Sequence, residues 1–348
     1  MREMMMNPRM IALLLAGLLM MTGALAQAGD DTLYPRQNVP VANVEIIDTL
    51  DAVTLRITGT LSDSCDELMW AWAWSNDVLF IDLYREIRPE VSCAAVETPY
   101  EFVVPIETQV NEHFVDPAQF VLVVNEFMLR VDWQAEVRTS NALPYSLQLS
   151  KGTVRVDTVS RTADGVRLTG EMGCGYLVAR VVKDWTQPEA NLYRVEAYLA
   201  IDPAMMCIAG FVPFDVTLPT DTPEGALYNV NGFMMPTEFG MEAAGQSYSI
   251  MEMPVTDVTS TIQESFPPQL ALTASGTTDG CDYPVQLVFE PLLEGYSIIT
   301  ARVARVIPVG IACPAVAVDF TASGSLTVPT PGEYTLIVNG EERGSVGL

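Results

Sequence analysis

Short runs of alternating apolar and polar residues recur along the chain. Val53–Thr58, Val166–Thr169 and Leu270–Thr273 alternate with period two, which places successive side chains on opposite faces of a β-strand. Asn231-Gly232 and Asn339-Gly340 lie between further strand-like runs, and Asn-Gly supplies the positive φ angles of a tight hairpin. The pattern predicts an all-β protein.

Further runs of strand length, rich in apolar residues, support the same prediction. They occupy Val78–Leu83, Phe102–Ile106 and Phe120–Val124, and 23 glycines and 23 prolines punctuate the chain between such segments. Hydrophobic residues make up 49% of the sequence and charged residues only 18%. The chain therefore has enough apolar material for packed cores, and disorder is not expected.

The first residues resemble an export signal. Arg2 and Arg9 precede a largely apolar run from Met10 to Met21, and small residues follow in Ala24-Leu25-Ala26. A positive start, a short apolar centre and an A-x-A site predict a signal peptide over residues 1–26, and a mature protein that is secreted, periplasmic or extracellular. The alternative is an uncleaved membrane anchor, because about 17 apolar residues approach a minimal span. Nothing later predicts membrane insertion.

Export changes the meaning of the six cysteines. In an oxidising compartment an even number of cysteines favours disulfides. Successive gaps of 28, 81, 33, 74 and 32 residues alternate between short and long, which favours pairing of neighbours. Zinc is the alternative, but the chain has no C-x-x-C pair and one histidine. The predicted bridges are Cys65–Cys93, Cys174–Cys207 and Cys281–Cys313.

The cysteines also mark a threefold repeat. The first cysteines of the pairs are 109 and 107 residues apart, and the second cysteines 114 and 106. A glycine precedes each first cysteine, an aromatic residue lies seven positions after each second one, and Val-Asn recurs near the end of each unit. These residues are Gly59, Gly170 and Gly276; Tyr100, Phe214 and Phe320; and Asn125, Asn231 and Asn339. The predicted units are residues 40–135, 150–237 and 253–348.

About seven strands in about 100 residues are typical of an immunoglobulin-like β-sandwich. Gly276-x4-Cys281, Cys313-x6-Phe320 and Gly332-x-Tyr334 followed by Val338-Asn339-Gly340 resemble bacterial secreted immunoglobulin-like repeats. The resemblance implies three tandem immunoglobulin-like β-sandwich domains, each with one internal disulfide, and implies no activity. The second cysteine precedes the late tyrosine strand by about twenty residues, unlike the inter-sheet bridge of antibody domains, so the strand order stays open.

Charge and motifs exclude several classes of function. Forty-four acidic and 18 basic residues give a net charge of −26, which excludes a phosphate-neutralising surface for nucleic acid. Hydrolase, zinc-protease, phosphate-loop and EF-hand motifs are absent, and His113 lies in a turn-like stretch of one unit only. We expect no catalytic residue, cofactor or metal. Calcium beside the acids Asp63, Asp66, Asp279 and Asp282 is a minor alternative.

One strand-like segment, Met69–Trp74, stands out for its tryptophans. Trp70, Trp72 and Trp74 alternate with alanines and share one face of a strand. Counted without gaps from the first cysteines, the alanine face aligns with the apolar Val285, Leu287 and Phe289, which predicts exposed tryptophans. A shift of one residue reverses this and predicts a core strand.

These observations favour a non-enzymatic, secreted, multi-domain binding or adhesion protein. The first unit would recognise a glycan or a protein, with Trp70, Trp72 and Trp74 as candidate ligand-binding residues. One alternative is a secreted inhibitor or chaperone-like module that binds a partner by a sheet edge or a loop. A carboxylate-based hydrolase is a more remote alternative.

Overall fold

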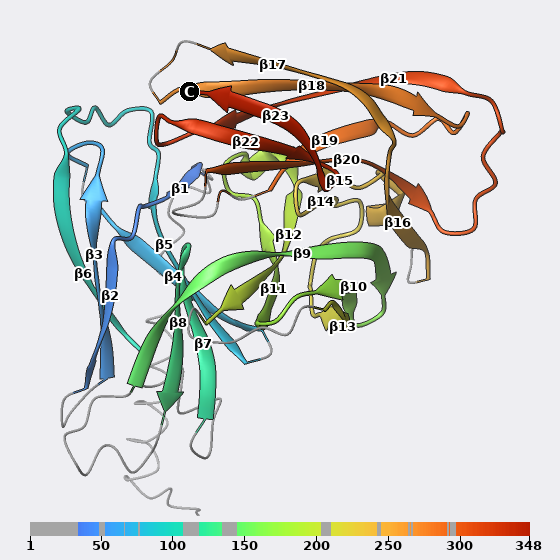
Figure 1. Cartoon of the computed structure of the whole chain (residues 1–348). Coiled ribbons are helices and arrows are strands. Elements are labelled where there is room, and N and C mark those ends of the chain that lie inside the picture. Colours follow the sequence, from blue (N-terminus) through green and yellow to red (C-terminus); the bar gives the residue numbers. More distant parts are fainter. Residues whose placement is uncertain are drawn as a thin grey trace, which may run out of the picture. The chain divides into compact units, whose positions relative to one another are not determined.

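The fold is built almost wholly from β-strands (Figure 1). The computed structural model describes residues 34–48, 53–65, 67–75, 77–106, 118–133, 145–202, 210–241, 245–263, 265, 267–290, 292 and 297–348. The predicted signal peptide and His113 lie outside these residues. Residues Pro35–Leu348 form one compact unit. Within the described segments, no helix is long and apolar enough to span a membrane.

The first repeat consists of two sheets. Its strands are β1 (Arg36–Asn38), β2 (Asn43–Asp48), β3 (Val53–Leu61), β4 (Met69–Ser75), β5 (Val78–Glu86), β6 (Thr98–Pro105), β7 (Ala118–Val124) and β8 (Phe127–Trp133). One sheet has the order β2-β3-β6. In the other, β5 pairs with β4 and with β7, β7 pairs with β8, and the short β1 pairs with the far end of β5.

The other two repeats use the same pairing order. The second contains β9 (Tyr145–Thr162), β10 (Gly165–Met172), β11 (Tyr176–Lys183), β12 (Leu192–Ile201), β13 (Val212–Leu218), β14 (Leu227–Val230) and β15 (Phe233–Met234), together with the 3-10 turn η3 (Pro188–Ala190) and the helix α3 (Glu238–Met241). The third contains β16 (Ser247–Glu252), β17 (Val255–Gln263), β18 (Gln269–Thr278), β19 (Val285–Phe289), β20 (Ile298–Pro308), β21 (Val318–Thr327), β22 (Glu333–Val338) and β23 (Glu341–Gly347).

Among the described strands, each repeat contains one parallel pair. The pairs are β5–β7, β12–β14 and β20–β22, while the hairpins around them are antiparallel. Both sheets of an antibody domain are antiparallel. The strand order that the sequence left open is therefore not that of an antibody domain. The strand content confirms the all-β prediction.

Each repeat has its own core cluster between its sheets. In the first repeat, Leu55 and Ile57 of β3 face Leu79 and Ile81 of β5, and all four side chains are fully buried. Burial of such a side chain contributes about 1.5–3 kcal/mol. The alternating run Val53–Thr58 thus forms a strand with its apolar residues inward, as the period of two predicts.

The glycine and aromatic residues of the repeat signature contact each other across the sheet. Gly59 pairs with Tyr100, and Gly276 pairs with Phe320. A Cβ on Gly59 would lie 2.2 Å from the carbonyl oxygen of Pro40 and 2.7 Å from the Tyr100 ring. The glycine is thus required because backbone and ring both pack against its bare Cα.

The signature asparagines use their side-chain amides to bond to neighbouring strands of the same repeat. Asn125 has φ +53° and lies in the turn after β7. Its Oδ1 accepts the N–H of Leu83, and its Nδ2 donates to the carbonyl oxygens of Leu83 and Val39, at 2.8–2.9 Å. Asn339 makes the same three bonds in the third repeat, and Asn231 makes two of them in the second. The side-chain amide therefore extends the backbone ladder beyond the end of the parallel strand.

Backbone pairing also connects the repeats. The 18-residue strand β9 pairs with β8 of the first repeat, with β10 and β12 of the second, and with β16 at the start of the third. These connections give one continuous hydrogen-bonded sheet of 17 strands. The segments between repeats thus contribute strands as well as linkers.

Disulfides hold two of the corners where strands three and four of a repeat are joined. The bridges Cys65–Cys93 and Cys281–Cys313 are present as predicted, with Cα atoms 5.5 and 4.9 Å apart. Cys174 is also disulfide-bonded. Cys207 lies outside the described residues, so its predicted pairing stays a prediction.

Candidate functional site

The three tryptophans lie on β4, on the face that points toward the core of the first repeat. Trp70, Trp72 and Trp74 pair across the ladder with Leu83, Ile81 and Leu79, which are fully buried. Trp70 and Trp74 are half-buried and pack against the core. Trp72 is 44% exposed.

An aromatic contact holds one end of this row. The ring of Trp74 lies edge-on to that of Phe120, with 5.5 Å between centroids. Edge-to-face pairs of this kind contribute about 0.5–1.5 kcal/mol beyond area burial. The tryptophans are thus two packed residues flanking one exposed residue, rather than a flat exposed row.

The gap-free alignment of the third repeat is wrong by one residue. Trp72 pairs with Ile81, which pairs with Val124, whereas Phe289 pairs with Ala301, which pairs with Val338. Trp72 is thus structurally equivalent to Phe289. It follows its cysteine by seven residues, and Phe289 follows Cys281 by eight. The extra residue in the third repeat puts the apolar face of β19 and the tryptophan face of β4 on the same side of the sandwich.

The strands equivalent to β4 are covered within the chain. On β11, Arg180 is bonded to Asp82 of the first repeat, and its guanidinium lies 4.6 Å from the Phe80 ring centroid. On β19, the amide of Gln286 makes two hydrogen bonds, of 2.8 and 2.9 Å, with the backbone of Met234 in the second repeat.

The middle of β4 is open by comparison. Ala71, Trp72 and Ala73 are all exposed, and among the described strands β4 pairs with β5 alone. Residues Met69–Ser75 include no charge and no proline. The first repeat therefore presents an uncharged sheet edge that carries one exposed tryptophan.

The acids beside two disulfides are held by arginines. Asp63 Oδ1 accepts the N–H of Cys65 and bonds to Arg85, and the hydrogen bond from Arg85 is the main reason that the pKa of Asp63 is lowered. In the third repeat Asp279 bonds likewise to Cys281 N–H and, at 2.7 Å, to Arg305. Asp63 and Asp279 are each already neutralised by an arginine, so neither is a free ligand for calcium.

The second repeat replaces this ion pair by an apolar pair. Its positions equivalent to Asp63 and Arg85 are Met172 and Leu199, and both pack against the core of the second repeat. The change of both partners together identifies the ion pair as a structural element of the corner, because removing only one would leave a buried charge unpaired.

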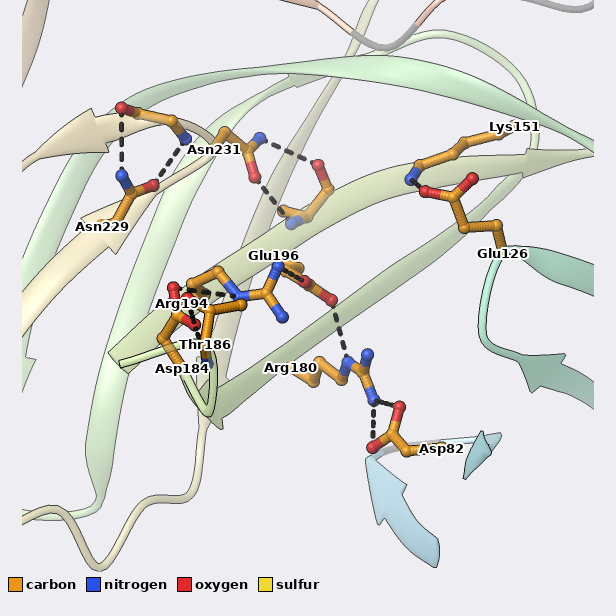
Figure 2. Close-up of polar contacts among 12 residues, drawn as sticks. Asp82, Glu126, Lys151, Arg180, Asp184, Thr186, Arg194, Glu196, Asn229 and Asn231 are labelled. Carbon is orange, nitrogen blue, oxygen red and sulfur yellow. Dashed lines mark hydrogen bonds and ion pairs between the residues drawn. The ribbon is translucent and has the colours of Figure 1, made fainter. Parts of the chain in front are cut away.

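A cluster of ions lies where the first and second repeats meet (Figure 2). Arg180 bonds to Asp82 at 2.8 Å and to Glu196 at 2.9 Å, and Arg194 lies 3.5 Å from Glu196. Burial alone would raise the pKa of Glu196, but attraction to Arg180 and Arg194 outweighs it and lowers the pKa. A general acid needs a raised pKa, so Glu196 does not suit that role.

Sequence reasoning did not find this cluster, although a signal was present. Arg180 stands among the valines of β11, at a position where an apolar strand face would be continuous. A lone arginine in such a run requires an acidic partner from elsewhere in the fold.

No family model matches the chain, and no curated protein or solved structure matches it significantly. The structure itself defines the class, an all-β protein with disulfides and internally repeated pairs of sheets.

Proposed function

We propose that the chain is an exported, non-enzymatic binding protein that contacts its partner through the outer edge of β4. Three tandem β-sandwich repeats of immunoglobulin-like architecture would carry this edge, and disulfides suit the oxidising compartment that export implies. The carrying observation is the exposed, uncharged centre of β4 in Ala71, Trp72 and Ala73.

Natural proteins protect free sheet edges with charges, prolines, bulges or covering segments. β4 has no charge or proline. Ser75 at its end bonds to Ala179 of β11 at 2.8 Å, but its centre is exposed, whereas the central residues Arg180 of β11 and Gln286 of β19 bond to a neighbouring repeat. An edge left in this state is suited to accept an added strand from a partner, with the exposed Trp72 ring as the side-chain anchor.

The half-burial of Trp70 and Trp74 favours a protein partner over a glycan. Stacking on a row of sugar rings needs several exposed aromatic faces, and only Trp72 among the three is exposed. Because the chain carries a net charge of −26, the partner segment should be extended and neutral or basic.

Two substitutions test the proposal on arrays of extended peptides and of glycans. Trp72→Ala removes the anchor and Ala73→Lys places a charge on the edge, and each should weaken peptide binding by about tenfold or more while changing the unfolding free energy little. Trp74→Ala is the matched control, since it removes a tryptophan packed on the core and should cost several kcal/mol of stability.

Unchanged peptide binding by both edge variants would refute the role of β4. Binding of glycans but not peptides, lost in Trp72→Ala, would instead support carbohydrate recognition and would also refute a strand-adding partner.

A further inference from the structure

A cavity of about 210 Å³ lies where the second and third repeats meet. Its walls include Lys151 of β9, Glu196 of β12 and Phe233 of β15. On the side of the third repeat they include Val288, Glu290 and Arg302.

Close contacts fix the two sides of this cavity. Gly232 packs so closely on Val288 that a Cβ at this position would lie 2.3 Å from Val288 Cγ1. The two hydrogen bonds between Gln286 and the Met234 backbone hold the same two strands together. The cavity is therefore a defined feature of the interface.

Three of the four charged groups in the wall already have ionic partners. Glu196 pairs with Arg180 and Arg194 as described above. Lys151 lies 4.0 Å from Glu126, and Arg302 pairs with Glu252 at 3.2 Å.

Glu290 is the exception. Among the described residues no cationic group lies within 4.0 Å of its carboxylate, and no hydrogen bond reaches it. Burial raises the pKa of Glu290, attraction to Arg302 partly opposes the rise, and repulsion from Glu252 adds to it. A half-buried carboxylate without a partner is costly, and a cation in the cavity would remove that cost.

The wall determines which kind of cation fits. A metal ion would need about six oxygen ligands, but the Asn231 amide is bonded to the Ala197 backbone and Glu196 is bonded to arginines. Val288 and Phe289, both half-buried, provide apolar surface, whereas Phe233 is only 1% exposed. The volume lies below the roughly 300 Å³ at which pockets for drug-sized molecules begin.

We propose that this cavity binds a small organic ammonium ion with a short apolar stem. The ammonium group donates hydrogen bonds to Glu290, and the stem packs on Val288 and Phe289. The site is separate from the edge of β4 and does not depend on the function proposed for it.

The probe is n-butylammonium, and n-butanol and butyrate are its neutral and anionic counterparts. Saturation-transfer NMR titration of the purified chain should show binding of n-butylammonium and much weaker binding of the other two. Glu290→Gln should lower the association constant by about tenfold or more, because it removes a charge-assisted hydrogen bond. The matched control is Glu342→Gln, which removes an exposed acid of β23 and should leave binding unchanged.

A second variant tests the proposal by an expected gain of affinity for n-butylammonium rather than a loss. Lys151→Gln removes a like charge from the wall and should raise the association constant for n-butylammonium severalfold. Equal binding of butyrate or n-butanol, no binding of n-butylammonium, or unchanged affinity in both Glu290→Gln and Lys151→Gln would overturn the proposal.

Discussion

Replacing Asn125 by alanine tests the hydrogen bonds that its side-chain amide makes with Leu83 of β5 and with Val39. The substitution removes three side-chain hydrogen bonds, and it leaves the N–H and carbonyl groups of Leu83 and the carbonyl group of Val39 without these partners. It also places alanine at φ +53°, in the left-handed region.

The expected cost follows from these contacts. Each hydrogen bond contributes about 0.5–1.5 kcal/mol net, and the site is 9% exposed, so water replaces the lost partners poorly. The left-handed backbone adds roughly 1 kcal/mol for alanine. Asn125→Ala should therefore lower the unfolding free energy by about 3–5 kcal/mol.

Urea denaturation of the purified chain, followed by tryptophan fluorescence, measures the loss. Asn231→Ala should cost about 1 kcal/mol less, because Asn231 makes two such bonds rather than three. Asn191→Ala is the control for the backbone alone, since Asn191 has φ +46° without these bonds. Equal losses in Asn125→Ala and Asn191→Ala would show that the side-chain amide contributes nothing and would refute the reasoning.

Because Arg85 lowers the pKa of Asp63 from its ordinary 3.8, this carboxylate stabilises the fold above that value, and the contribution is lost as the pH falls through the lowered pKa. Acid titration of stability should show this fall, and Asp63→Asn should remove it. Gly59→Ala should destabilise strongly in thermal melts because of its contacts at 2.2 and 2.7 Å, whereas Gly347→Ala, with nothing within 4 Å, should not. Non-reducing peptide mapping should recover a peptide joining Cys174 to Cys207, and a link from either to another cysteine would contradict the predicted pairing.

The strands and the repeat could be predicted because the contacts within each repeat leave local patterns in the sequence. Alternation in Val53–Thr58 follows from one buried face, and Gly59 with Tyr100 follows from one close cross-strand contact. The parallel pairing of β5 with β7 could not be predicted, since strand order depends on which apolar surfaces meet in space. Only the position of Asn125 hinted at it.

The candidate site was predicted less well for a specific reason. The register of β19 relative to β4 depends on a single extra residue between Cys281 and Phe289. Because side chains alternate between the two faces of a strand, a shift of one residue assigns every side chain to the wrong face. The cavity beside Glu290 could not be predicted either, because its walls come from two repeats whose docking leaves no local pattern.

The long strand β9 makes the repeats mechanically dependent on one another. In an array whose units touch only through side chains, one unit can open while its neighbours stay folded. Here, peeling β9 out of the second repeat also strips β8 of its outer neighbour and β16 of its support. Thermal melting should therefore spread across the boundaries, so that the array responds to heat or tension as one cooperative body.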